Sequence, residues 1–149
     1  MKLHKLHKHV SVLMVGCGRF GSYLASSLSK EGYDVTMIDK DEKAFNKLNE
    51  EFSGFTFCGD ATDIDTLCDC GIKQADIVLV ATDSDNVNSM IAQIANVIFH
   101  VERVYIRLND TDKEELLRGT SIQAIYPARL SILEFEHISH IHLTKENIL

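Results

Sequence analysis

The chain has 149 residues, a formal net charge of −7 at pH 7 and 45% hydrophobic residues. This length suits one domain that buries roughly two-thirds of the surface exposed by its unfolded chain. The acidic balance argues against a nucleic-acid partner, because nucleic-acid surfaces need clustered Lys and Arg. No apolar stretch approaches the roughly 20 residues of a membrane-spanning helix, so we expect no membrane span.

The N-terminus and the cysteines both bear on the cellular compartment. Residues 1–9 form a basic leader with three lysines and three histidines. Such a leader could approach an acidic partner or an anionic membrane face, but short charged ends are usually solvated, and we predict a flexible segment. The N-terminus is not a secretory signal, and no regular disulfide framework relates Cys17, Cys58, Cys68 and Cys70. We expect reduced thiols in a cytoplasmic protein.

Short apolar runs alternate with segments of helical period along the chain. The six runs cover residues 10–15, 34–38, 54–58, 77–81, 104–108 and 124–126. Most are continuously apolar, as expected for strands that are buried on both faces. The alternation predicts an α/β fold: a doubly wound, Rossmann-like parallel sheet of about six strands, in the order 3-2-1-4-5-6, with helices on both faces.

Helical patterns fill the intervals between these runs. The stripes that predict helices are Phe20-Leu24-Leu28, Phe45-Leu48-Phe52, Ile64-Leu67-Cys68 and, most strongly, Val87-Met90-Ile91-Ile94-Ala95-Ile98. Thr111 and Glu114 predict a capping box for a fifth helix. After Pro127, residues 128–149 form a C-terminal segment whose Leu130, Leu133, Ile138 and Ile141 predict one more helical face.

A glycine motif follows the first predicted strand, in the run Gly16-Cys17-Gly18-Arg19-Phe20-Gly21. Its three glycines suit a sharp turn, a close approach of phosphate to the backbone, and tight packing of the next helix. Asp39 ends the second strand and would accept hydrogen bonds from ribose hydroxyls. Together these features predict a dinucleotide-binding unit that favours NAD or an adenosine phosphate over NADP, although Lys40 weakens this preference.

Polar residues also follow the third and fourth predicted strands. They are Gly59-Asp60-Ala61-Thr62 after the third, and residues 82–86 with Asn88 after the fourth. Ligands of open parallel sheets lie across the carboxyl ends of the strands, so both loops should border the same cleft. Thr62, Asp63 and Asp85 could instead serve only as helix N-caps, and the sequence leaves both possibilities open.

Over nearly its whole length the chain resembles the KTN, or RCK N-terminal, domain of Trk and Ktr potassium uptake proteins and of ligand-gated potassium channels. The glycine motif and Asp39 contribute to this resemblance. More specific are Gly59-Asp60-Ala61-Thr62, Ala81-Thr82-x-x-Asp85-x-x-Asn88, Leu67 with Gly71-Ile72 and Ala75-Asp76, and Arg107 on the fifth strand.

The resemblance implies a role for each matching position. The phosphates would be surrounded by Gly16, Cys17, Gly18, Arg19, Phe20 and Gly21, and the ribose would lie at Asp39 and Lys40. The adenine would lie beside Gly59, Asp60, Ala61 and Thr62. The pyrophosphate or second nucleoside would lie at Ala81, Thr82 and Asp83, with Arg107 within reach of the cleft. Arg19 could pair with a terminal phosphate, or it could simply face solvent.

The function implied by the resemblance is that of a nucleotide-binding regulatory subunit or domain of a potassium transporter or channel. The ligand would be NAD(H) or an adenine nucleotide such as ATP, ADP or AMP. The partners would be a membrane potassium transporter or channel subunit and further copies of the chain, as a dimer or larger ring. Residues 128–149 could form a dimer contact, or their helical face could pack on the chain's own sheet. The chain would be cytoplasmic, at the inner face of the cell membrane.

An NAD-dependent oxidoreductase is the alternative from another functional class. No substrate domain follows the nucleotide-binding unit, residues 10–127, and none of the four tyrosines begins a Tyr-x-x-x-Lys pair. Ser22 stands where a P-loop needs lysine. We therefore expect a regulator and not an enzyme. The sequence does not distinguish this regulator from a nucleotide-stabilised assembly subunit that has no transport partner. A metal could be suggested by the histidines at 137, 140 and 142 with Cys68 and Cys70. The Cys-x-Cys spacing is not that of a usual zinc site, and His137 and His140 could simply occupy the polar side of a helix, so no metal is predicted.

Overall fold

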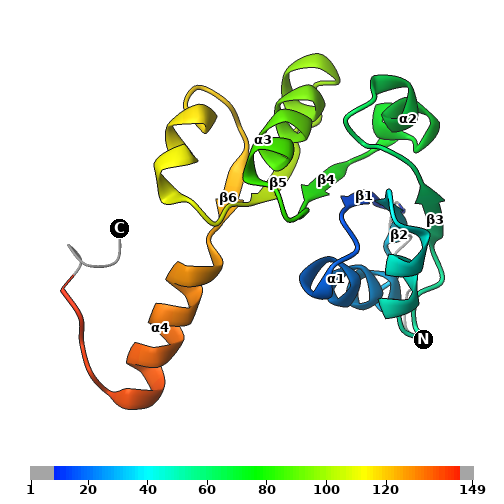
Figure 1. Ribbon diagram of the computed structural model, residues 1–149. Coiled ribbons are helices and arrows are strands. Elements are labelled where there is room, and N and C mark those ends of the chain that lie inside the picture. Colours follow the sequence, from blue (N-terminus) through cyan, green and yellow to red (C-terminus); the bar gives the residue numbers. More distant parts are fainter. Residues whose placement is uncertain (1–8, 145–149) are drawn as a thin grey trace, which may run out of the picture.

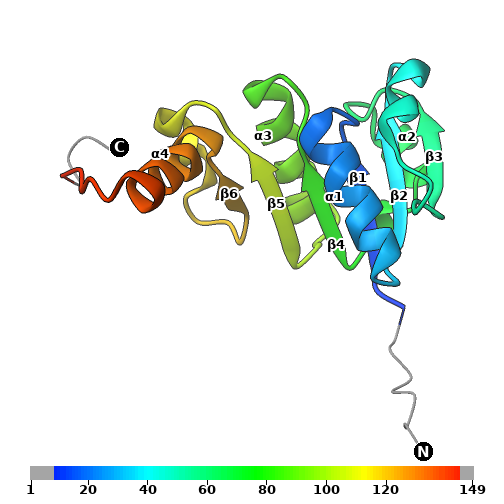
Figure 2. The ribbon, with the colours of Figure 1, turned by 90° about the horizontal axis from the view of Figure 1, so that it is seen from below.

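The computed structural model describes residues 9–144, which form a six-stranded, fully parallel sheet with helices on both faces (Figures 1 and 2). The strand order is β3-β2-β1-β4-β5-β6. The predicted fold class and strand order are confirmed, and no strand bound differs from its prediction by more than one residue. The strands are β1 (Ser11–Val15), β2 (Asp34–Asp39), β3 (Phe55–Cys58), β4 (Ile77–Val80), β5 (Arg103–Arg107) and β6 (Gln123–Ile125).

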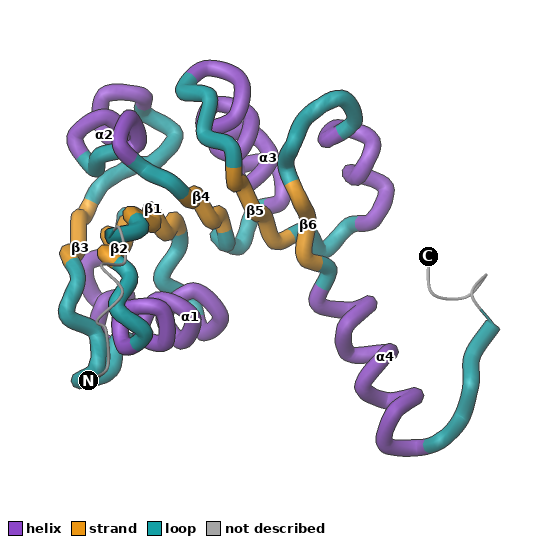
Figure 3. The backbone as a smooth tube through the Cα atoms, turned by 180° about the vertical axis from the view of Figure 1, so that it is seen from behind, coloured by secondary structure: helices purple, strands orange, loops and turns teal. Residues whose placement is uncertain are grey.

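The helices divide between the two faces of the sheet, as the views from either side show (Figures 1 and 3). One face carries α1 (Arg19–Lys30) and the 3-10 helix η1 (Glu42–Lys47). The other face carries α2 (Ile64–Asp69), η2 (Ile72–Gln74), α3 (Asp85–Gln93) with its π-helical extension η3 (Ile94–Ile98), and the 3-10 helix η4 (Thr111–Leu117). Among residues 9–144, no helix is both long and apolar enough to cross a membrane.

The core has two parts, one on each side of the sheet. Because successive strand residues point to opposite faces, β1 supplies Leu13 to one part and Met14 to the other, and both side chains are buried. Leu13 packs in the cluster that includes Ile91 of α3, whereas Met14 packs in the cluster that includes Ala25 of α1. Burial on both faces explains why these strands are continuously apolar in sequence.

Three predictions for the helices before Pro127 need correction. The predicted stripe Phe45-Leu48-Phe52 lies only partly in a helix, because the 3-10 helix η1 contains Phe45 but ends at Lys47, before Leu48 and Phe52. The predicted capping box is wrong, because Asp110 is the N-cap of η4 and accepts a hydrogen bond from the amide of Asp112, while Thr111 lies inside the helix. Ile98 is exposed, because the wider π-helical turn rotates it away from the face set by α3.

The last helix, α4 (Pro127–Ser139), projects away from the sheet beyond β6 (Figure 1). Pro127 occupies its first turn, a position where a missing N–H costs nothing. No residue of α4 is buried, and Leu130, Leu133 and Ile138 are about half exposed or more. Ile141 lies outside the predicted helical face, because the helix ends at Ser139 and His140 adopts a left-handed conformation, with φ 58°.

The basic leader lies almost entirely outside the described residues, which begin at His9. His9 is exposed, and its Nδ1 lies 3.4 Å from a carboxylate oxygen of Asp34. All four cysteines are free.

Candidate nucleotide-binding site

A cavity of about 440 Å³ opens at the carboxyl edge of the sheet, around the ends of β1, β2 and β4. The strand order reverses between β1 and β4, which is where open α/β sheets place their ligands. Twelve of the predicted site residues line it: Gly16, Cys17, Gly18, Asp39, Lys40, Gly59, Asp60, Ala61, Thr62, Ala81, Thr82 and Asp83. Four do not: Arg19, Phe20, Gly21 and Arg107.

The three motif glycines have different surroundings. Gly16 has φ +99°, and a Cβ there would lie 2.6 Å from the carbonyl oxygen of Ala81. A Cβ on Gly21 would clash with the carbonyl oxygen of Gly16, so the helix packs directly on the turn. By contrast, a Cβ on Gly18 would meet no atom within 4 Å. Gly16 and Gly21 therefore build the turn, while Gly18 keeps open the space beside it.

The N-terminus of α1 meets this open space. Gly18 is the N-cap residue, and no side chain caps the helix or places a carboxylate in its first turn. The first-turn N–H groups therefore lack side-chain acceptors, and the helix dipole makes this end partly positive. Such an end can accept a phosphate group. Phe20 and Gly21 lie within this first turn and would contribute backbone N–H groups to such a site, although neither lines the cavity.

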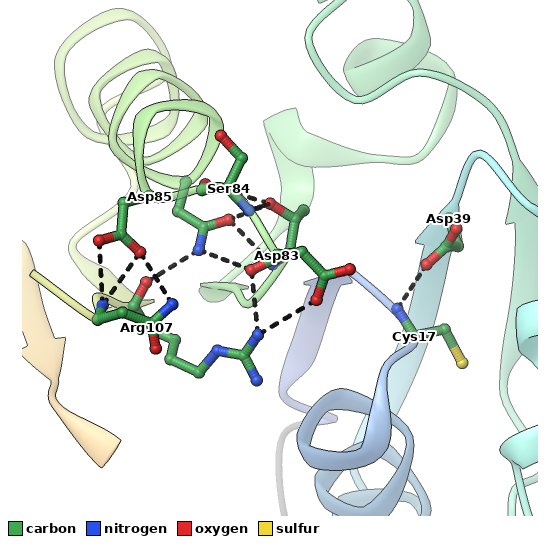
Figure 4. Close-up of polar contacts among 9 residues, drawn as sticks. Cys17, Asp39, Asp83, Ser84, Asp85 and Arg107 are labelled. Carbon is green, nitrogen blue, oxygen red and sulfur yellow. Dashed lines mark hydrogen bonds and ion pairs between the residues drawn. The ribbon is translucent and has the colours of Figure 1, made fainter. Parts of the chain in front are cut away.

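Asp39 lies at the edge of the cavity, where backbone amides fix its carboxylate; the bond from Cys17 is drawn in Figure 4. One carboxylate oxygen accepts the amide of Cys17 at 2.8 Å, and the other accepts the amide of Asp41 at 2.8 Å. The first of these bonds ties the end of β2 to the glycine loop. Each carboxylate oxygen has a further lone pair, so Asp39 could still accept a hydroxyl of a ligand.

Asp60 is held in a turn at the β3 end of the cavity. It accepts hydrogen bonds from the amide of Thr62 at 2.9 Å and from its hydroxyl at 2.7 Å. These bonds, the hydroxyl bond above all, lower the pKa of Asp60. Thr62 is therefore not an N-cap, whereas the cap predicted at Asp63 is confirmed, because Asp63 accepts the amide of Asp65 in the first turn of α2.

Asn88 ties together the two strand ends on the other side of the cavity. Its side chain is fully buried. Its oxygen accepts the amide and the hydroxyl of Thr82, at 2.9 Å and 2.5 Å. Its nitrogen donates to the carbonyl oxygens of Thr82 and Arg107, at 3.1 Å and 2.9 Å. One amide thus fixes the loop after β4 against the end of β5.

Arg107 reinforces the same loop instead of facing the cavity (Figure 4). Its guanidinium donates to the carbonyl oxygen of Thr82 at 3.1 Å and lies 3.7 Å from a carboxylate oxygen of Asp83. The side chain of Asp83 is exposed, which makes this ion pair weak.

Asp85 is not the N-cap of α3, because Ser84 accepts the amide of Val87 and holds that position. The buried carboxylate of Asp85 instead accepts the amides of Asn109 and Asp110, at distances of 2.9 to 3.1 Å. It therefore anchors the loop between β5 and η4 (Figure 4). Sequence reasoning missed this role because the partner amides lie 24 and 25 residues away.

Cys17 packs beneath the cavity against η1. Its buried Sγ lies 3.3 Å from the carbonyl oxygen of Ala44. Burial is the main cause that raises the pKa of this thiol, and the negative charge of Asp39 raises it further, whereas the positive charge of Lys47 lowers it by less. Cys17 is therefore a neutral packing residue at physiological pH.

Five residues that line the cavity were not predicted from the sequence, apart from the strand residues Val15 and Ile38. They are Asp41, Ala44, Lys47, Val87 and Ile91, whereas Ser84 belongs to the loop of residues 82–86 that was predicted to border the cleft. Asp41 and Lys47 are the charged residues among them, and no motif marks Lys47, which lies eight residues after Asp39 at the end of the 3-10 helix η1. Among the residues that the structure describes, no group of three metal-ligating side chains is present.

The chain matches the model of the TrkA-N domain family over residues 12–127. It is 34% identical over 118 residues to the Trk system potassium uptake protein TrkA of Streptomyces coelicolor, which covers 79% of this chain and 53% of that protein. It is 31% identical over 114 residues to the TrkA homolog of Methanothermobacter thermautotrophicus, covering 76% and 52%. The chain thus spans about half the length of these relatives.

Solved structures share the fold at lower sequence identity. GsuK bound to ADP aligns with a TM-score of 0.73 and 23% identity, over 89% of this chain and 35% of that one. The GsuK channel bound to NAD gives 0.68 and 16%, over 83% and 22%. The Shewanella denitrificans Kef CTD in its AMP-bound form gives 0.67 and 22%, over 93% and 86%. From the family match, the chain belongs to the TrkA-N domain family.

Proposed function

We propose that this chain binds NAD(H) or an adenine nucleotide in the cavity and serves as the nucleotide-binding regulatory module of a potassium uptake system. The observation that carries the proposal is the open space beside Gly18 at the uncapped N-terminus of α1. Two relatives are named as Trk system potassium uptake proteins, which supports the link to potassium. Structures of the same fold that hold NAD, ADP or AMP support the ligand class.

In this proposal the cavity holds the ligand along the strand ends. The glycine loop and the first turn of α1 take the phosphates, and Asp39 accepts a ribose hydroxyl. Asp60 and Ala61 lie beside the adenine, while Thr82 and Asp83 border the pyrophosphate or second nucleoside. Arg19 and Arg107 do not line the cavity and would contact the ligand only after their side chains move.

The described residues that line the cavity favour binding over catalysis. None is a histidine or a tyrosine, the side chains that most often transfer protons beside a nicotinamide. Cys17 lines it, but its raised pKa and its burial make it a poor nucleophile. The aspartates are hydrogen-bonded to backbone amides or lie beside Arg107. We infer a ligand-binding module and not an oxidoreductase.

We further propose that two copies pair through α4, while residues 10–127 form the nucleotide-binding part. The exposed apolar side chains of α4 would be shielded from water in such a pair. The pair would act in the cytoplasm, at the inner face of the membrane that holds the transporter. A nucleotide can shift the arrangement of the pair only if it binds the two arrangements with unequal affinity.

The test is solution scattering of the protein alone and with saturating ATP, ADP, NAD or NADH. We expect a dimer whose scattering profile differs between at least two of these ligands. The double variant Leu133→Glu/Ile138→Glu should be monomeric, because it places charges on the side of α4 that carries these exposed apolar residues. Ser139→Glu, on the opposite side of the same helix, should remain dimeric. Identical profiles in all ligand states would contradict regulation through the pair, and a wild-type monomer would contradict the pairing itself.

A further inference from the structure

Two lysines provide the positive charges that line the cavity within the described residues. Lys40 follows β2 directly, and Lys47 ends η1. Neither forms an ion pair within 4.0 Å in the part of the chain that the structure describes. Lys30 and Lys113, by contrast, each lie beside a carboxylate.

The aspartates of the cavity are already engaged. Asp39 accepts two backbone amides, Asp41 accepts the amide of Lys43, and Asp60 accepts two bonds from Thr62. Hydrogen bonds of this kind spread the negative charge of a carboxylate and stabilise it without a cation. The charges that lack a partner in the cavity are therefore the two ammonium groups.

Both lysines lie on the β2 side of the cavity, away from the Thr82 loop. Lys47 follows Ala44 by one 3-10 turn, and the carbonyl oxygen of Ala44 contacts Cys17 of the glycine loop. Lys40 lies between Asp39 and Asp41 in the chain, and the Lys40 carbonyl oxygen lies 3.6 Å from the Sγ of Cys58 at the end of β3. The charge of Lys40 also adds to the hydrogen bonds from Thr62 that lower the pKa of Asp60. The lysines thus flank Asp39, the residue assigned to the ribose.

We propose that Lys40 and Lys47 form a second phosphate-binding element, which holds a phosphate group on the adenosine ribose of the ligand. This inference rests on the proposed function, because it assumes that an adenylate lies in the cavity with its ribose at Asp39. A cation near this carboxylate is what accommodates the 2′-phosphate of NADP in dinucleotide-binding folds. The site then accepts ribose-phosphorylated adenylates, contrary to the preference for NAD that Asp39 alone predicts.

Repulsion from the nearby carboxylates opposes this attraction. The two lysines share the cavity lining with Asp39, Asp41 and Asp60, and each of these carboxylates already accepts hydrogen bonds within the chain. A lysine is a flexible point charge, so both side chains can converge on a phosphate at the open rim. Both lysines are exposed, so this convergence needs no change in the backbone.

The test compares 5′-AMP with adenosine 2′,5′-bisphosphate, which differ only in the ribose phosphate. We expect the full-length wild-type chain to bind the bisphosphate at least as tightly as 5′-AMP by isothermal titration calorimetry. Lys47→Gln and Lys40→Gln should each weaken the bisphosphate by about tenfold and change 5′-AMP by less than about twofold. Lys43→Gln is the matched control, since Lys43 lies on the same 3-10 helix but does not line the cavity.

Three results would overturn the inference. The wild-type chain could bind 5′-AMP at least tenfold more tightly than the bisphosphate, or Lys47→Gln and Lys40→Gln could leave the ratio of the two affinities unchanged. In both cases the proposed nucleotide site would stand. If neither ligand bound, and NAD, ADP and ATP also failed to bind, the proposed function would fall together with this inference.

Discussion

At the scale of single residues, Asn88 fixes the Thr82 loop that borders the cavity, although it does not line the cavity itself. Its buried amide makes four hydrogen bonds to Thr82 and Arg107, which belong to two neighbouring strand ends. A buried polar group that loses its partner costs about 1–3 kcal/mol. Asn88 therefore couples the position of the Thr82 loop to the stability of the whole fold.

We predict that Asn88→Ala lowers the free energy of unfolding by about 3 kcal/mol, because it removes a fully buried amide and leaves partly buried polar groups of Thr82 and Arg107 without partners. Urea denaturation followed by circular dichroism measures this change. Asn46→Ala, at an exposed position of η1, is the control and should change the value by less than about 0.5 kcal/mol. A loss below about 1 kcal/mol for Asn88→Ala would mean that the network contributes little.

At the scale of elements, burial decides what the sequence can predict. Strands such as β4 are apolar throughout because helices cover both faces, and this pattern was visible in the sequence. The caps were harder to predict, because Ser84 and Asp85 are adjacent residues that both suit an N-cap, and only the distant amide of Asn109 decides between them. The cavity was predicted at its motifs but not at Lys47, which tertiary packing of η1 brings to it.

The burial of each cysteine, which for Cys17 is due to the packing of η1, predicts how fast its thiol reacts. Cys17 is buried beneath η1 with a raised pKa, and burial raises the pKa of Cys70 to about 11, whereas Cys58 is exposed. Because the thiolate is the reactive form, we expect iodoacetamide at pH 8 to modify Cys58 at least about tenfold faster than Cys17 or Cys70. A raised pKa means that Cys17 and Cys70 gain reactivity only as the pH rises further.

Peptide mass spectrometry over a time course measures these three rates. Urea at a denaturing concentration is the control, since all thiols should then react at similar rates. Equal rates for Cys17 and Cys58 in the native protein would contradict the docked position of η1.

At the scale of the whole molecule, a cavity lies at the carboxyl ends of the strands. The last helix, α4, projects away from the sheet beyond β6 (Figure 1). The cavity borders the glycine loop, Asp39 and the Thr82 loop, so a single ligand would touch three neighbouring strands. A ligand that spans several strand ends can influence the packing of elements beyond them. This arrangement suits a module that reports which nucleotide is bound.

Calorimetric titration of the wild-type chain and of Gly18→Val with NAD, NADH, ATP, ADP and AMP tests whether the space beside Gly18 holds a nucleotide phosphate. Gly18 has φ −81° and free space beyond its Cβ, so valine should fit without altering the fold while it fills the space assigned to a phosphate. We predict saturable binding of at least one ligand to the wild-type chain, weakened by at least about tenfold in Gly18→Val at an unchanged melting temperature. Failure of all five ligands to bind the wild-type chain, or equal binding by the variant, would contradict the account.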